Sequence, residues 1–422
     1  MQNKATVRAA FIAVTTLFFA WGLITSLIDP LVAAVKGIFT LTDMEAQLSA
    51  SAFFIAYALI SFPAAVLIAR IRAVPAILLA LAIMVAACLI MLGAANIAQY
   101  SLVLLGLFVL ASGITVLQVA ANPLAAALGA PEKSHFRLTL AQTFNSFGTF
   151  IGPYVGAVLF LEGLEVKEGT LVTDQARQNA LLGIDMAYFW ICGLLLLLFA
   201  FFFLSRRTVA AAAPEPAPAK GIGAMIADAV SSRWCLLGGA AIFLYVGAEV
   251  AIGTQMALFL NDDGVWGITL QDAGKFVSFY WGGAMVGRAI GSLLLARFDA
   301  ARLLAIFTAI ACAMCLYVVA VGGVSAGYVA LAIGLFNSIM FPVIFTLTLE
   351  RSTASEQATS GFLCTSIVGG AALPPLVGLV SGATGYVTAM LLPAACYALL
   401  VLFAVKASRT PPLRAAEAMS AH

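Results

Sequence analysis

Two acidic side chains, Asp29 and Glu249, lie inside long apolar stretches of the chain, in the segments LITSLIDPLV and YVGAEVAIG. A charged carboxylate at the centre of a bilayer costs roughly 2.5–3.5 kcal/mol or more, so a carboxylate in such a place is a functional candidate. Burial favours the protonated carboxyl, whereas an opening to water favours the charged form. We therefore predict Asp29 as a proton-coupling residue and Glu249 as a second one. The alternatives are a carboxyl neutralised by a hydrogen bond and, for Glu249, a brace for its own helix.

Uncharged polar side chains occur in the same kind of apolar stretch. Five of them are amides: Gln118, Asn122, Gln142, Asn145 and Asn337. Amides offer donors and acceptors without a charge, which suits a neutral, polyhydroxylated ligand. Trp21 stands about two helical turns before Asp29, where its ring could stack on a sugar ring or pack in the core. We predict all six as substrate-binding residues; the alternative for the amides is interhelical hydrogen bonding, worth about 0.6–2 kcal/mol each.

Sequence signatures of catalysis and of metal binding are missing. The two histidines, His135 and His422, fall in a predicted loop and at the tail. Cys312 and Cys315 have the spacing of a metal or redox site but no further ligands, so we interpret all seven cysteines as small apolar side chains. No HExxH motif or nucleotide-binding loop occurs. We predict that the chain is not an enzyme and binds no metal or cofactor, which leaves ion gradients or downhill flow to drive any transport.

The elements that must position these residues are membrane-crossing helices. The chain has 422 residues, of which 63% are hydrophobic and 9% are charged, and its mean hydropathy is +1.07. A soluble protein of this length would carry about a quarter charged residues. A bilayer core of about 30 Å needs about 20 apolar residues per helix. Twelve predicted spans meet this length: 9–36, 46–69, 74–95, 99–129, 138–162, 183–204, 234–260, 273–296, 302–322, 326–349, 358–380 and 384–406.

The basic residues predict how these spans are oriented. Sixteen of the 21 Lys and Arg residues fall in cytoplasmic segments when the N-terminus is placed inside, four fall outside, and Arg288 lies within the eighth span. This asymmetry predicts that both termini are cytoplasmic. We expect a multi-pass protein of a bacterial inner membrane. The net charge of +2 gives no basic field for nucleic acid.

The longest interior break divides the spans six and six. It is the Ala/Pro segment RRTVAAAAPEPAPAKG at 206–221, whose composition is typical of a linker. We predict an N-terminal half over 1–205, a cytoplasmic linker over 206–232, and a C-terminal half with a short tail over 233–422.

The two halves also resemble each other. LIARIRA at 67–73 matches LLARFDA at 294–300, and LQVAANP matches FNSIMFP, each pair at corresponding places of the halves. Two pseudo-symmetric six-helix halves are typical of transporters that expose a central site to alternate sides. Asp29 and Glu249 should then face each other across a central cavity. Such folds work as monomers, and we expect a monomer here.

Five stretches resemble a known group of proteins: LFFAWGLITSLIDPLV, QVAANPLAAALG, FRLTLAQTFNSFGTFIGP, YVGAEVAIG and NSIMFPVIFTLTLE. The chain is similar over essentially all twelve spans to the fucose/glucose–galactose proton symporter family of the major facilitator superfamily. The resemblance implies that Asp29 takes part in proton coupling and sugar binding. It also implies roles for Gln142 and Trp21. At Gln118 the fucose branch has a glutamate, so the chain looks closer to the glucose/galactose branch.

The chain departs from the family pattern beside Asp29. Ile28 stands where members usually have an asparagine, and Pro30 stands where another residue is usual. Ile28 makes that side of the predicted cavity drier, which leaves the particular sugar open. Pro30 has no N–H group, so we expect the helix to bend or unwind next to the carboxylate.

The sequence therefore predicts a secondary active importer of a neutral monosaccharide by proton symport. Glucose, galactose, fucose, mannose and N-acetylglucosamine remain open as substrates, with sodium as the alternative coupling ion. The second hypothesis is a proton-driven exporter of metabolites or drugs, which the amide-rich centre disfavours. A sensor with a transporter-like body is a third, disfavoured because the loops are short and leave no soluble domain.

Overall fold

The computed structural model of the protein describes residues 4–128, 134–164, 173–213, 221–295 and 297–412. This part of the chain is helical and contains no β-strand. Its elements are α1 (Lys4–Ser26), α2 (Ile28–Phe39), α3 (Asp43–Ile71), α4 (Ala73–Ile97), α5 (Tyr100–Ala127), α6 (Ser134–Phe160), α7 (Asp174–Ala212), α8 (Ile222–Ser231), α9 (Arg233–Asn261), α10 (Leu270–Leu295), α11 (Ala300–Val321), α12 (Gly323–Asn337), α13 (Met340–Arg351), α14 (Glu356–Thr365), the 3₁₀ turn η2 (Ser366–Val368), α15 (Gly369–Thr384), α16 (Tyr386–Ala389) and α17 (Leu391–Arg409).

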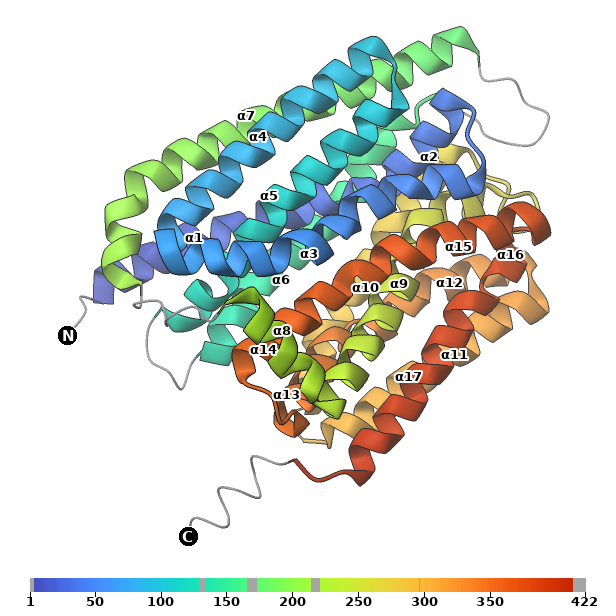
Figure 1. The fold of residues 1–422 in the computed structure, drawn as a ribbon. Helices are drawn as coiled ribbons and strands as arrows, with labels where there is room; N and C mark the ends of the chain where they lie inside the picture. The colour runs from blue at the N-terminus through green and yellow to red at the C-terminus, as the bar shows by residue number, and fades with distance from the viewer. Residues whose placement is uncertain (1–3, 129–133, 165–172, 214–220, 296, 413–422) are drawn as a thin grey trace.

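Ten segments within the described residues are long and apolar enough to cross a membrane. The helices α6 and α10, of 27 and 26 residues, are not among these ten segments but run beside them (Figure 1). With these two, the bundle has the twelve spans that the sequence predicts. Four of the spans consist of more than one helix: α1 with α2, α12 with α13, α14 with η2 and α15, and α16 with α17.

The first span is interrupted next to Asp29, as Pro30 led us to expect. Helices α1 and α2 are separated at Leu27. Pro30 cannot donate the backbone hydrogen bond that would join its turn to the preceding one. The tenth span is interrupted in the same way, because Pro342 stands in the first turn of α13 as Pro30 stands in that of α2. The two prolines thus determine where these spans break.

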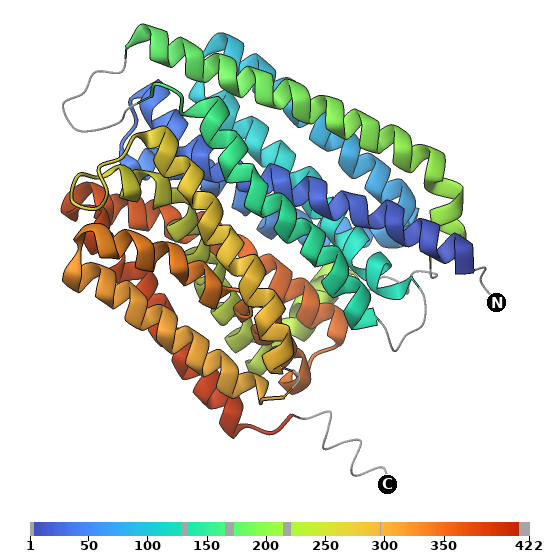
Figure 2. The same cartoon turned by 180° about the vertical axis from the view of Figure 1, so that it is seen from behind.

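The helices form two groups, α1–α7 and α9–α17, which lie side by side (Figures 1 and 2). The groups meet where α3 packs against α15, α6 against α10 and α2 against α9. The beginning of α1 and the end of α17 lie toward the same end of the bundle (Figure 1). A chain that crosses the membrane an even number of times must begin and end on the same side.

The predicted linker is partly helical. Helix α7 continues to Ala212, beyond the expected end of its half at residue 205, and α8 lies inside the predicted linker. Alanine has the highest helix propensity, which explains why the helix continues through the Ala-rich stretch after Val209. Residues 214–220 of the linker and 413–422 of the predicted tail lie outside the described residues. The exact boundaries of the halves therefore stay a prediction.

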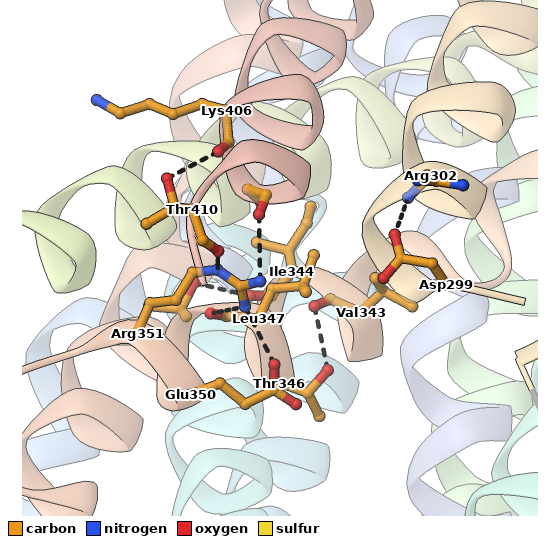
Figure 3. Close-up of polar contacts among 12 residues, drawn as sticks. Asp299, Arg302, Val343, Ile344, Thr346, Leu347, Glu350, Arg351, Lys406 and Thr410 are labelled. Carbon is orange, nitrogen blue, oxygen red and sulfur yellow. Dashed lines mark hydrogen bonds and ion pairs between the residues drawn. The ribbon is translucent and has the colours of Figure 1, made fainter. Parts of the chain in front are cut away.

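A buried arginine joins α13 to the end of α17 (Figure 3). The Arg351 side chain is 6% exposed and donates to the backbone carbonyls of Ala407 and Thr410 at 3.1 and 3.0 Å. It also donates to the Leu347 carbonyl and to the Glu350 carboxylate. The last carbonyls of a helix lack partners within the helix and carry partial negative charge, so a cation is stabilising there. Arg351 therefore fixes the last helix of the bundle to the tenth span.

We expect Arg351→Met to lower the free energy of unfolding by about 2–3 kcal/mol, because the substitution leaves buried carbonyls without donors. The melting temperature of the purified protein in detergent measures this loss. Arg302→Met is the matched control, since Arg302 lies near the same end of the bundle but its side chain is exposed (Figure 3). Equal melting temperatures for the two variants would contradict the role of Arg351.

Candidate functional site

Asp29 is buried between the two halves. Its side chain is 4% exposed and belongs to the first turn of α2, beside the break at Leu27. The indole N–H of Trp281, on α10 of the other half, donates to the Asp29 carboxylate. Gly253 on α9 lies against the same carboxylate, because a Cβ placed on Gly253 would come within 3.5 Å of Asp29 Oδ1. The predicted proton carrier therefore contacts two helices of the opposite half.

Glu249 lies on α9, which packs against α2, and its carboxylate interacts electrostatically with that of Asp29. The Glu249 side chain is half-buried. Tyr245, one turn earlier on the same helix, and Arg288 on α10 both lie near the Glu249 carboxyl group. Both predicted proton-coupling residues thus belong to the interface between the halves. That they line one central cavity stays a prediction.

Three of the predicted amides, all half-buried, make hydrogen bonds to other side chains within the first half. Gln118 on α5 donates to the hydroxyl of Tyr57 on α3 at 2.8 Å. Gln142 on α6 donates to the Asn122 side chain on α5 at 3.4 Å. These bonds link α3, α5 and α6. This is the interhelical hydrogen bonding that we gave as the alternative role of the amides. Their partial exposure also leaves them accessible to a ligand.

Asn145 takes part in the packing of α1 against α6, and Trp21 is buried on α1. The Asn145 amide donates to the Phe18 carbonyl at 3.1 Å. A Cβ on Gly22 would lie only 2.3 Å from the Asn145 carbonyl oxygen, so the two helices approach closely because this residue is a glycine. Trp21 is buried, and its ring lies 4.3 Å from that of Phe18 between centroids. The substrate-binding roles of Asn145 and Trp21 stay predictions.

Asn337 lies at the end of α12 and is fully buried, with an exposed fraction of 0%. Its amide donates to the Tyr280 hydroxyl at 2.8 Å and accepts from the Tyr397 hydroxyl at 2.8 Å. The Tyr245 hydroxyl donates to its backbone carbonyl at 3.2 Å. Asn337 is therefore surrounded by three tyrosines of its own half in this structure. A direct contact with substrate stays a prediction and would need this cluster to open.

Two contacts between the halves involve residues that the sequence analysis did not assign to the site. Trp281 binds Asp29, and the Arg288 guanidinium donates to the Ser146 hydroxyl on α6. Ser146 in turn donates to the Gln142 carbonyl at 3.0 Å. A lone arginine within a span was the signal that could have found Arg288, because such a charge is costly in a bilayer. No comparable signal marks Trp281, since tryptophan is common in membrane helices.

A second group of polar contacts joins the two halves at the end of the bundle where α2 is followed by α3. We call this group the α2–α3 clasp. Its residues are Lys36, Asp43, Gln47, Thr254, Gln255, Ser381 and Tyr386.

The α2–α3 clasp is centred on Asp43, which pairs with Lys36 of its own half. The hydroxyls of Tyr386 and Ser381, from the other half, donate to Asp43 at 2.9 and 3.1 Å. Gln255 donates to Ser381 at 2.9 Å, which extends the clasp to α9. The predicted orientation puts this end of the bundle on the outer side of the membrane. The clasp therefore closes the end of the molecule that is predicted to face outward.

Comparison with known proteins agrees with this architecture. A sequence profile described as Major Facilitator Superfamily matches residues 10–363. The chain belongs to this superfamily. Within it, the chain is 39% identical over 401 residues to a glucose/galactose transporter of Brucella abortus, covering 95% of this chain and 94% of that one. It is 30% identical over 413 residues to the L-fucose-proton symporter of Escherichia coli, covering 95% and 93%. The resemblance to the family of these transporters is confirmed.

Solved structures give the same assignment. A variant of the E. coli fucose:proton symporter matches with a TM-score of 0.71 at 28% identity, covering 96% of this chain and all of that one. The same symporter in an outward conformation matches with a TM-score of 0.70 at 30% identity. The all-α membrane fold of twelve helices in two six-helix halves is thereby confirmed. The protein is a multi-pass membrane transporter rather than an enzyme, as its relatives are.

Proposed function

We propose that the protein imports a neutral monosaccharide together with protons by alternating access, with Asp29 as the coupling group. The observation that carries the proposal is the buried Asp29 carboxylate, which lies beside a helix break and contacts the opposite half. A change in how the halves meet must change the surroundings of this carboxylate. Burial favours its protonated form and access to water its charged form, so each change of conformation can load or release a proton.

The transported ligand in this proposal is an uncharged sugar. Support comes from the half-buried amides Gln118, Asn122 and Gln142, which supply donors and acceptors without charge. Of the related proteins named above, one is described as a glucose/galactose transporter and the other as an L-fucose-proton symporter. Glucose and galactose are our first candidates, followed by fucose, mannose and N-acetylglucosamine. We further propose a bacterial inner-membrane location, a monomeric state and cytoplasmic termini.

Uptake into proteoliposomes tests the proposal. The purified protein is reconstituted, an inward pH gradient or an inward sodium gradient is imposed, and uptake of each labelled candidate sugar is measured. We expect accumulation above the external concentration with the pH gradient alone. Accumulation with sodium alone would reassign the coupling ion. Efflux of a compound against its gradient in exchange for protons would favour the exporter instead.

We expect Gln118→Ala and Gln142→Ala each to weaken sugar binding by about 1–3 kcal/mol, because each removes a polar partner from a partly buried ligand. This corresponds to an increase in Kd of about five- to 150-fold, measured by titration of the purified variants. Gln175→Ala is the matched control, because Gln175 is an exposed amide that bonds Asn179 at the start of α7. Unchanged affinity in both test variants would mean that these two amides only join helices.

A further inference from the structure

The contact between Trp281 and Asp29 combines two properties that bear on proton transfer. First, the indole N–H can donate a hydrogen bond but cannot accept one. A donor of this kind binds a charged carboxylate more strongly than a protonated one. Second, Trp281 lies on α10 and Asp29 on α2, in different halves of the molecule. The bond therefore depends both on the charge of Asp29 and on the way in which the halves meet.

The surroundings fix the position of the indole. A Cβ on Gly253 would lie 3.1 Å from Trp281 Cζ2 as well as 3.5 Å from Asp29 Oδ1, so both groups rest on the bare backbone of α9. The Tyr280 ring packs edge-on against the indole, with centroids 5.1 Å apart. The Tyr280 hydroxyl donates to the Glu249 carbonyl at 3.0 Å, which holds α10 against α9. The donor is thus held in place before Asp29 loses its proton.

The charged neighbours of Asp29 do not supply this stabilisation. Glu249 on α9 interacts electrostatically with Asp29 and disfavours a second negative charge. Arg288 on α10 attracts the Glu249 carboxylate and donates a hydrogen bond to the Ser146 hydroxyl. Lys36, at the far end of α2, is paired with Asp43 in the α2–α3 clasp. The Trp281 N–H is the group that donates directly to the Asp29 carboxylate.

We propose that Trp281 is a positioning residue that stabilises the charged, proton-free form of Asp29 while α2 is docked on α9. In this way Trp281 promotes proton release when the α2–α3 end is closed. When the halves separate at that end, the bond is lost and Asp29 holds its proton more firmly. This inference rests on the proposed function, because it assumes that Asp29 is the coupling group.

The test is the pH dependence of Trp281→Phe in proteoliposomes. The probe is labelled glucose or galactose, whichever the wild type accumulates faster. Net uptake is measured at fixed external pH while the internal pH is lowered, since internal protons oppose release from Asp29. We expect the internal pH that halves net uptake to rise by about one unit, which corresponds to a tenfold change in proton affinity. Sugar exchange at equal pH on both sides should stay near the wild-type rate.

The matched control is Trp266→Phe. The Trp266 indole donates to the Val324 carbonyl at 2.9 Å, within one half, so this variant loses a similar bond with no effect on Asp29. An analogue that replaces the indole N–H of residue 281 with sulfur keeps the ring shape and should reproduce the shift. It serves as the second variant if Trp281→Phe folds poorly.

The outcomes separate this inference from the proposed function. If Trp281→Phe or the sulfur analogue has the same internal-pH profile as Trp266→Phe, the inference is wrong. It is also wrong if exchange and net uptake fall together without a shift in pH, because that result indicates a packing role. If Asp29→Asn vesicles still concentrate the sugar, the proposed coupling group itself is wrong.

Discussion

We expect Asp29→Asn to abolish accumulation of sugar against its gradient and to leave exchange of sugar across the membrane largely intact. The amide cannot carry a proton, but its carbonyl can still accept the Trp281 hydrogen bond, so the packing of α2 should survive. The ratio of internal to external sugar under an imposed pH gradient should fall to about one. Exchange of labelled for unlabelled sugar measures the step that remains.

Glu249→Gln is the informative comparison for this prediction. It neutralises the other carboxylate of the interface, and one proton per sugar needs only one carrier. We expect Glu249→Gln to retain more accumulation than Asp29→Asn. Normal accumulation by Asp29→Asn, or a complete loss confined to Glu249→Gln, would move the coupling role to Glu249.

The second large effect concerns the α2–α3 clasp. We expect Asp43→Ala to shift the molecule toward the arrangement that is open at this end, because Lys36, Ser381 and Tyr386 all lose their common partner. Removing one member of a buried ion pair costs roughly 3–5 kcal/mol, so the shift in population should exceed a hundredfold. Net uptake should slow at least tenfold, since the closed arrangement is part of each cycle.

Hydrogen exchange of the backbone amides in α2 and α16 measures this opening directly, and uptake rates report its consequence. Asp272→Ala is the matched control, because the ion pair of Asp272 with Lys275 lies within a single helix, α10. If Asp43→Ala and Asp272→Ala exchange alike and transport alike, the clasp does not control closure.

The features that could be predicted from the sequence are those that depend on a single helix. Long apolar runs predicted the spans, and Pro30 predicted the break beside Asp29, because both effects act within one segment. The carboxylates Asp29 and Glu249 were recognisable because a charge within an apolar run is costly wherever it packs. Helix α7 continues to Ala212, beyond the predicted end of the sixth span at 204, since alanine favours a helix also after an apolar run has ended.

The contacts between helices could not be predicted in the same way. Trp281 and Asp29 are joined only because α10 and α2 meet, and neither residue's neighbours in the chain indicate the partner. Asn337 matches Gln118 in the sequence repeat, yet it is enclosed by tyrosines that come from α9, α10 and α17. Corresponding positions of the repeat therefore share a place in the fold but differ in their surroundings.

The proline breaks have a mechanical consequence. Helices α2 and α13 each have 12 residues beyond their break, and they lie toward opposite ends of the bundle (Figure 1). At 1.5 Å per residue each is a lever of about 18 Å. A bend of about 20° at the break, which a proline readily allows, moves the lever's tip by about 6 Å, roughly half the diameter of a helix. Either end could then be opened by the swing of one short lever, while the long helices behind it keep their packing.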